Sequence, residues 1–263
     1  MIGSCTYCSY MTPIKSAQRV FEVLELFQTQ RSPLRLQDIC NQLGYPASSA
    51  SALLKSIVAL GYLRYDKSAR TYMPTMKIID LGSWVQSAIF GDSSLMRAMQ
   101  ELSARFGETV TLAMQSDLHA QYVYLLPSRL PIWYLLPIGT LRTLTTSGGG
   151  LLMLAAKGNV EIRKICKRIE FHRLDPARPS LAEVMEQVEE CRRQGWIFSK
   201  HRIESGAGGI SVLLEDPPFG RGYALGVHGP VERLEANEVE IVQALREAAK
   251  SVQSHIHAAS ATF

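Results

Sequence analysis

The sequence predicts an α+β protein made of a small helical part that ends in a β-hairpin and a larger part in which helices accompany a sheet. Two observations carry this prediction. Over the first ninety residues, apolar side chains recur every three or four positions, which is the period of a helix. After Gly107 the pattern changes to strands, and helical segments return between and after them. A length of 263 residues suits one large or two ordinary domains.

The composition is that of a folded protein, since 46% of the residues are hydrophobic and 20% are charged. No long apolar run and no secretory signal is present, so we expect a cytoplasmic protein that is not in a membrane. Five cysteines do not suggest a disulfide framework. Cys5 and Cys8 have the spacing of half a zinc site, but no second pair completes four ligands. We therefore expect a flexible tail over residues 1–13, no metal and no cofactor.

Three short helices are predicted next. The first runs from about Ser16 to Thr29, and the second, Leu36 to Leu43, is closed by Gly44, which suits a left-handed C-cap. After a Tyr-Pro turn, Ser48 is expected to cap a third helix that ends at Gly61. Three helices with a tight turn between the last two form a helix-turn-helix arrangement.

A hairpin follows the third helix, which predicts a winged form of this arrangement. The expected strands are Tyr62 to Tyr65 and Arg70 to Met73, joined by a turn over Asp66 to Ala69. Three basic residues lie on or beside the tip of this wing: Arg64, Lys67 and Arg70.

All the excess positive charge lies in the first third of the chain. Residues 1–90 hold nine Lys and Arg against five acids, whereas residues 91–263 hold nineteen of each. Basic residues near phosphates gain affinity by counterion release, so a polyanion partner is the natural interpretation. A merely solvated basic face is the alternative. Together with the wing, the charge favours DNA binding. Phosphate contacts are expected from Arg31, Arg64, Lys67 and Arg70. Contacts in the major groove are expected from Ser48, Ser49, Ser51 and Lys55.

An apolar helix is expected over residues 75–91, after which Gly91 breaks the pattern. We predict that it joins two domains, 14–74 and 92–263, and packs against its copy in a dimer. The residues expected at this interface are Ile78, Leu81, Trp84 and Val85.

The second domain mixes strands and helices. The expected strands are Thr109 to Met114, Gln121 to Leu126, Ile132 to Leu136, Trp196 to Lys200, Ile210 to Leu214 and Tyr223 to Val227. The expected helices are Leu95 to Phe106, Gly149 to Ala156, Val160 to Ile169, Leu181 to Gln194 and Leu234 to about His257.

Two glycine clusters interrupt this domain, Thr145 to Gly150 before a helix and Glu204 to Gly209 before a strand. Backbone N–H groups at a helix start can hold an anion. No Walker lysine follows Gly150, so a small carboxylate or simple loop flexibility are the alternatives. Ser147 lacks the nucleophile-elbow pattern, and no histidine has metal-ligand spacing. An enzyme using a pocket of this domain is the competing hypothesis.

The chain from Ile14 onward closely resembles the IclR family of bacterial transcription regulators. The resemblance is carried by the segments Ile14 to Val20, Pro46 to Leu54, Gly61 to Leu63, Tyr72 to Pro74, Gly139 to Gly150, Gly208 to Leu213 and Ala224 to Pro230. It implies a winged helix-turn-helix joined to a GAF-like effector domain, in dimers or tetramers that bind pseudo-palindromic operator DNA. Ala47 and Ala52 stand where the family usually has basic residues, so we expect a strong contribution from the wing.

The resemblance also implies an effector pocket, for which a small organic or aromatic acid is the expected ligand. Its expected lining is Ser147, Gly148, Gly149, Gly150, Leu151, Met153, Ser211, Leu213 and His228. His228 is expected to add a hydrogen-bond donor or, if protonated, a charge. A packed core without ligand is the alternative.

Overall fold

The computed structural model describes residues 14–90, 94–131, 136–174, 179–202, 204–214 and 222–260. The chain divides into two compact units, Met1–Ala88 and Ile89–Phe263, each of which mixes helices with an antiparallel sheet. The predicted α+β class is therefore confirmed. The tail expected over residues 1–13, with Cys5 and Cys8, lies outside the described residues.

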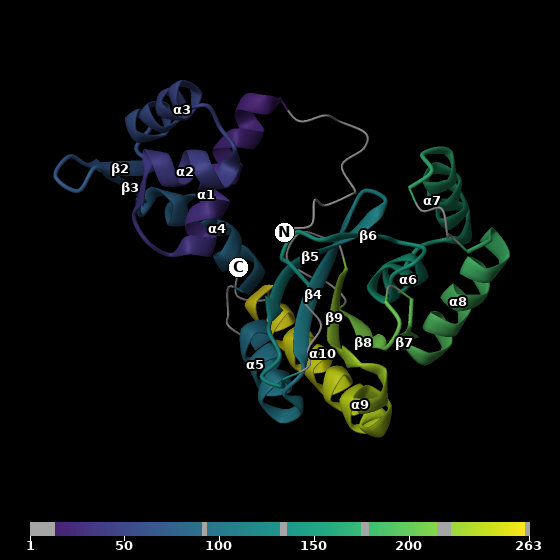
Figure 1. Cartoon of the computed structure of the whole chain (residues 1–263). Coiled ribbons are helices and arrows are strands. Elements are labelled where there is room, and N and C mark those ends of the chain that lie inside the picture. The colour runs from purple at the N-terminus through teal and green to yellow at the C-terminus, as the bar shows by residue number, and fades with distance from the viewer. Residues whose placement is uncertain are drawn as a thin grey trace. The chain divides into compact units, whose positions relative to one another are not determined.

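The N-terminal unit is a winged helix-turn-helix, as predicted (Figure 1). Its elements are α1 (Lys15–Gln30), β1 (Leu34–Arg35), α2 (Leu36–Leu43), α3 (Ala47–Ala59), β2 (Leu63–Asp66), β3 (Thr71–Pro74) and α4 (Lys77–Phe90). The three strands form a sheet in the order β1-β3-β2. One apolar core holds the helices against this sheet, and its most buried members are Val23, Phe27, Ile39, Leu54, Ile57 and Leu63.

Two local predictions in this unit are wrong, and one strand was not predicted. The third helix is not capped by Ser48, because it begins at Ala47 after Pro46, whose extended backbone ends the turn. The turn of the wing spans residues 67–70 instead of 66–69, since Arg70 adopts φ 54° and Asp66 still pairs with Thr71. Strand β1 was not expected; it is two residues long and exists through its pairing with β3.

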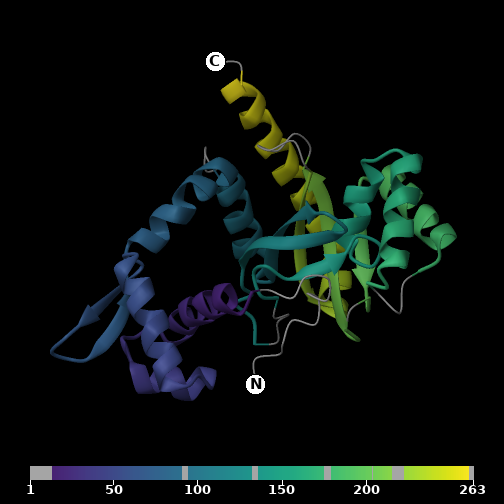
Figure 2. The ribbon, with the colours of Figure 1, turned by 90° about the horizontal axis from the view of Figure 1, so that it is seen from above.

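The C-terminal unit is a six-stranded antiparallel sheet between two layers of helices (Figures 1 and 2). Its strands are β4 (Thr109–Ser116), β5 (His119–Leu126), β6 (Leu141–Thr143), β7 (Trp196–Lys200), β8 (Ala207–Leu214) and β9 (Tyr223–Pro230), in the order β6-β5-β4-β9-β8-β7. Its helices are α5 (Ser94–Phe106), α6 (Gly148–Ala155), α7 (Asn159–Phe171), α8 (Leu181–Gln194), α9 (Val231–Ala236) and α10 (Glu238–Ser260).

Alternate residues of the central strands serve the two faces of this sheet. Leu112, Val212 and Leu225 belong to a core with α5 and α10, and Ala113 and Ala224 belong to a second core with α6, α7 and α8. The second face carries small residues, which lets α6 approach the sheet closely. This face, with the buried helix α6 upon it, is where the predicted effector residues converge.

The predicted order of elements is observed, with two differences. The final helix is divided at Asn237 into α9 and α10, although no Pro or Gly marks the break. Strand β6 was not expected, and it lies within the segment Gly139 to Gly150. Of the strand expected over Ile132 to Leu136, only Leu136 belongs to the described residues.

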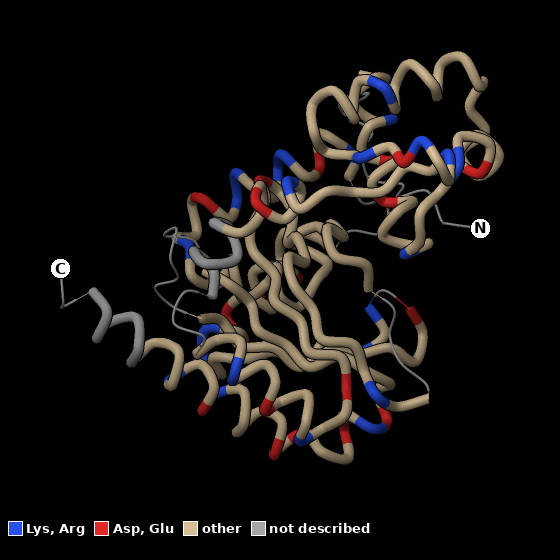
Figure 3. The backbone as a smooth tube through the Cα atoms, turned by 90° about the vertical axis from the view of Figure 1, so that its left-hand side faces the viewer, with Lys and Arg blue, Asp and Glu red and all other residues tan. Residues whose placement is uncertain are grey.

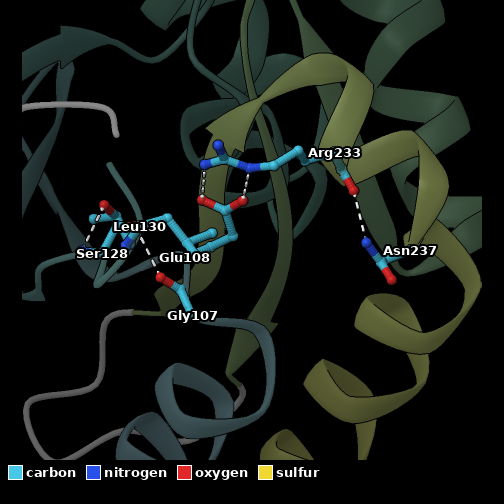
Figure 4. A network of polar contacts seen from close by, with 7 residues as sticks. Gly107, Glu108, Ser128, Leu130, Arg233 and Asn237 are labelled. Carbon is cyan, nitrogen blue, oxygen red and sulfur yellow. Dashed lines mark hydrogen bonds and ion pairs between the residues drawn. The ribbon is translucent and has the colours of Figure 1, made fainter. Parts of the chain in front are cut away.

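A buried ion pair holds α9 to the start of β4 (Figure 4). The guanidinium of Arg233 donates to both carboxylate oxygens of Glu108, at 2.6 and 2.9 Å, and the Glu108 side chain is only 5% exposed. A Cβ at Gly229 would come within 2.4 Å of that carboxylate, so the pair packs directly against strand β9 next to His228.

Candidate nucleic-acid interface and ligand cavity

Helix α3 presents a polar, exposed face on the N-terminal unit. Ala50, Leu54 and Ile57 are buried, which turns the opposite side of the helix outward. The residues exposed on that side are Ser48, Ser49, Ala52, Lys55 and Ser56. Ser51 is half-buried, so among the predicted groove residues it is the least accessible. The hydroxyl of Ser56 donates to the Ala52 carbonyl at 3.0 Å, which leaves Ser48, Ser49 and Lys55 as the outward polar groups.

The turn before α3 is anchored to α1. Gly44 ends α2 with φ 68°, a left-handed conformation that glycine adopts without strain. The hydroxyl of Tyr45 donates to the carboxylate of Glu22, and the guanidinium of Arg19 lies 4.9 Å from the centre of the Tyr45 ring. These contacts set the position at which α3 leaves the turn.

The wing carries exposed cations. Arg64, Lys67 and Arg70 are all exposed, and Asp66 organises the tip by accepting from the backbone N–H and hydroxyl of Ser68 at 2.8 and 2.6 Å. These hydrogen bonds, with one from the Ala69 N–H, lower the pKa of Asp66. Arg31 is exposed at the C-cap of α1, outside the sheet.

The register of the small sheet adds one cation that the sequence analysis missed. Arg35 pairs with Thr71, and Arg64 pairs with Met73, so both arginines lie on the face that carries Asp66, opposite the buried Leu34 and Tyr72. Arg35 is exposed. Two-residue pairing of β1 with β3 cannot be recognised from sequence spacing, which is why Arg35 was not identified.

Charge differs between the units along the backbone (Figure 3). In the C-terminal unit, acidic and basic positions are intermixed and several are paired, as in Lys200 with Glu235 and Arg168 with Asp117. In the described part of the N-terminal unit, by contrast, the recorded ion pairs include none of the wing arginines.

Helix α4 is attached to the winged unit at its start. Lys77 donates to the Leu60 carbonyl at 2.8 Å and lies over the Tyr62 ring, and the Thr75 hydroxyl donates to the Gly61 carbonyl at 2.6 Å. Leu81 is 58% exposed, whereas Ile78 is half-buried. The side chains of Trp84 and Val85 lie outside the described part of the chain.

A small cavity lies where α6 begins over the sheet of the C-terminal unit. Its volume is about 30 Å³. Of the predicted effector residues it brings together Ser147, Gly148 and His228. The remaining lining comes from β5, β7, β8 and the segments around them: Tyr122, Thr146, Ser199, Arg202, Ala207, Gly208 and Gly209.

The other predicted effector residues do not line this cavity. Leu151 and Met153 are buried in the core between α6 and α8, and Ser211 and Leu213 face the same helical layer from β8. Gly149 and Gly150 serve packing: a Cβ at Gly150 would lie 2.6 Å from the Leu144 Cα, and one at Gly149 would lie 3.1 Å from the Ala224 Cβ. The glycine cluster therefore lets α6 sit close to its neighbours.

His228 is a neutral member of the cavity. Burial lowers its pKa to about 4, which favours a neutral imidazole at neutral pH, so of the two expected roles the hydrogen-bonding one fits this environment. The ring meets Tyr122 edge-on with 6.0 Å between centroids. It also covers Gly209, where a Cβ would come within 2.4 Å of Nδ1.

The hydroxyl of Ser147 is used in hydrogen bonds at the start of α6. Ser147 is the N-cap of α6, and its hydroxyl accepts from the Gly150 N–H at 3.2 Å and donates to the Thr143 carbonyl at 3.0 Å. Its side chain thus holds the helix start in place, and the backbone around Gly148 forms the wall of the cavity.

Two larger hollows exist in the same unit. One of about 320 Å³ lies beside Glu108 and Arg233, and one of about 510 Å³ lies between α5 and α10. Among the described residues, no group of three or more His, Cys, Asp and Glu is placed to hold a metal ion. No helix within the described ranges has both the length and the hydropathy to cross a membrane.

Comparison with protein-family models gives two matches that together cover most of the chain. Residues 16–67 match the IclR helix-turn-helix domain, and residues 92–254 match the C-terminal domain of bacterial transcriptional regulators of the IclR type.

Curated relatives and solved structures agree with these matches. The transcriptional regulator XynR of Escherichia coli K12 is 24% identical over 203 residues, 77% of this chain and 81% of XynR. KdgR of Dickeya chrysanthemi is 25% identical over 246 residues, 92% of this chain and 80% of KdgR. The crystal structure of Thermotoga maritima IclR aligns with a TM-score of 0.71 at 19% identity, covering 92% of this chain and 98% of that one. An IclR homolog from Microbacterium hydrocarbonoxydans, complexed with 4-hydroxybenzoate, aligns with a TM-score of 0.66 at 21% identity, covering 92% and 99%.

Proposed function

Since this chain belongs to the IclR family of bacterial transcriptional regulators, we propose that it binds operator DNA as a homodimer or homotetramer and responds to a small organic or aromatic acid. The family and the curated relatives are transcriptional regulators, so the chain is a regulator and not an enzyme. A protein that binds bacterial operator DNA acts in the cytoplasm. The regulated genes would belong to a catabolic or metabolic operon.

The observation that best supports DNA binding is that the N-terminal unit exposes both a polar face of α3 and a basic face of its small sheet. We assign groove contacts to Ser48, Ser49, Ser51 and Lys55 of α3, and phosphate contacts to Arg31, Arg64, Lys67 and Arg70, with Arg35 added from the register of β1. Because Ala52 occupies the middle of the exposed α3 face, the wing supplies much of the affinity.

The dimer is assigned to α4. Its exposed apolar side chains include Ile79 and Leu81, each 58% exposed, and burying such a face against a second copy is favourable. Ile78, Trp84 and Val85 complete the proposed interface. A two-fold dimer places two α3 helices on successive major grooves, so the operator would be a pseudo-palindrome.

The effector is assigned to the cavity at the start of α6, within the proposed domain 92–263. Ser147, Gly148 and His228 would line the ligand, and Gly149, Gly150, Leu151, Met153, Ser211 and Leu213 would form the supporting walls. The acid class is supported by the complex of the Microbacterium homolog with 4-hydroxybenzoate. A ligand that favours one of two conformations of the dimer changes the affinity for DNA.

The test is DNA binding by the purified full-length protein to its own promoter region at several salt concentrations. We expect Arg64→Ala/Arg70→Ala to weaken binding and to lower the salt slope by about 0.9 for each lost phosphate contact. Arg163→Ala/Lys164→Ala removes the same charge from exposed positions of α7 and serves as the control. Unchanged affinity and slope in the wing variant would refute the assignment.

A further inference from the structure

The cavity as observed is too small for an organic acid to be enclosed in it. A cavity that binds benzene measures about 150 Å³, so a carboxylic acid of similar size does not fit within a cavity of about 30 Å³. A ligand must therefore extend beyond the enclosed space, past one of the residues at its boundary. Arg202 is the exposed residue among those that line the cavity with Gly208, Gly209 and His228, so the boundary toward solvent lies at Arg202.

Arg202 has no carboxylate recorded beside it within the described part of the chain, unlike three other cations of this unit. Arg168, Lys200 and Arg233 each pair with an acid, whereas no ion pair or hydrogen bond of Arg202 is recorded within the described part of the chain. Its recorded electrostatic neighbour is the Cys191 thiol. Burial raises the pKa of Cys191 to about 11, so this thiol is neutral at pH 7 and leaves the arginine charge uncompensated.

The turn that carries Arg202 is held by hydrogen bonds on both sides. The backbone N–H of His201 donates to the Ala207 carbonyl at 2.9 Å, and the Gly206 N–H donates to His201 Nδ1 at 2.9 Å. His201 itself adopts φ 55°, which turns the chain sharply before Arg202. The backbone is thus anchored at His201, the residue directly before the arginine.

Three glycines are among the residues that line the cavity with Arg202. Gly208 and Gly209 line the cavity from β8, and Gly148 lines it from the start of α6. A Cβ at Gly148 would approach the Ser199 hydroxyl to 2.9 Å, so these glycines keep free what space there is. At the inner end, His228 is about nine-tenths buried, has no hydrogen bond recorded among the described residues, and meets the Tyr122 ring edge-on.

We propose that Arg202 selects the effector by pairing with its carboxylate at the mouth of the cavity, while the neutral His228 hydrogen-bonds a hydroxyl or keto group at the ligand's inner end. The ligand class is then a small monocarboxylate with a second polar group away from the acid. This inference rests on the proposed effector function and adds the orientation of the ligand and the residue that recognises its charge.

The test measures binding of acids and their neutral amides to the full-length protein by calorimetry. The probes are pyruvate, benzoate and 4-hydroxybenzoate, each compared with its amide. We expect Arg202→Gln to weaken the acids by about 10- to 100-fold and to leave amide binding unchanged, since a charge-assisted hydrogen bond is lost. Lys200→Gln is the matched control: it removes a cation of the same hairpin that pairs with Glu235 and does not line the cavity.

The outcomes separate this inference from the proposed function. If an acid binds the wild type and Arg202→Gln equally well, the role of Arg202 is refuted while the acid effector stands. If Arg202→Gln weakens acid and amide alike, the arginine has only a structural role and the inference again fails. If none of the three acids binds the wild type, the acid class itself is refuted, together with the ion pair.

Discussion

Replacing Arg233 by methionine should destabilise the C-terminal unit more than replacing Glu108 by glutamine, although both changes break the same ion pair. The reason is the difference in burial: the Glu108 side chain is 5% exposed and that of Arg233 is 33% exposed. Without Arg233, a carboxylate stays buried with two bonds lost. Without the Glu108 charge, the guanidinium still reaches water and the amide oxygen of glutamine accepts one bond.

The expected magnitudes follow from that asymmetry. Stranding a buried charge costs about 3–5 kcal/mol, so Arg233→Met should lower the free energy of unfolding by that amount. Glu108→Gln should cost about 1–2 kcal/mol, the range of a weakened hydrogen bond. Arg105→Met is the control, because Arg105 and its partner Glu240 are 49% and 65% exposed, and an exposed pair contributes less than about 1 kcal/mol.

The assay is urea unfolding of the three full-length variants and the wild type, followed by tryptophan fluorescence. Equal losses in Arg233→Met and Glu108→Gln would refute the reasoning from burial. So would a loss in Arg105→Met as large as that in Arg233→Met. Since the Glu108 carboxylate packs against Gly229, next to His228, Arg233→Met should also weaken effector binding.

Three further predictions concern the cavity and the dimer. Because the folded-state pKa of His228 is about 4 and its unfolded value is 6.5, the unfolded chain binds more protons between these values. The free energy of unfolding should therefore fall by up to about 3 kcal/mol from pH 6.5 to pH 4, and His228→Gln should remove that share of the fall in urea titrations. Gly150→Ala, which sets a Cβ 2.6 Å from the Leu144 Cα, should lower the thermal midpoint more than Gly148→Ala, whose Cβ meets side-chain atoms only, at 2.9 to 3.3 Å from Ser199 and Ile197; equal midpoints would contradict this. Leu81→Asp should shift the protein toward monomer in analytical ultracentrifugation while Val160→Asp, also an exposed position, should not; an unshifted Leu81→Asp would exclude α4 as the interface.

An element was predictable where residues near each of its ends specify both its start and its end. Helix α8 has the predicted bounds, because Ser180 and Glu183 form a capping box at its start and Gly195 adopts φ 74° at its end. Helix α10 has no such start, since Asn237 interrupts an apolar pattern that continues through it. Strands β1 and β6 were not predicted because a strand of two or three residues is too short to show alternating hydrophobicity. Their pairing partners are also distant in the sequence.

The candidate site was only partly predictable for a related reason. Gly148 and Gly150 belong to the same glycine cluster in the sequence, but Gly148 lines the cavity and Gly150 packs closely against Leu144. This difference depends on which residues lie opposite each Cα. Arg202 is one basic residue among several near the β7 to β8 turn. Only the hairpin geometry places it at the cavity while Lys200 turns to Glu235.

The central claim, that the N-terminal unit reads operator DNA as a symmetric dimer, is tested most directly by selection from a random DNA library with the full-length protein. We predict enrichment of a pseudo-palindrome whose half-sites lie about one helical turn, or a multiple of it, apart. The Arg64→Ala/Arg70→Ala variant should enrich it far less. A selected pool without any shared sequence, or equal enrichment by the wing variant, would contradict the claim.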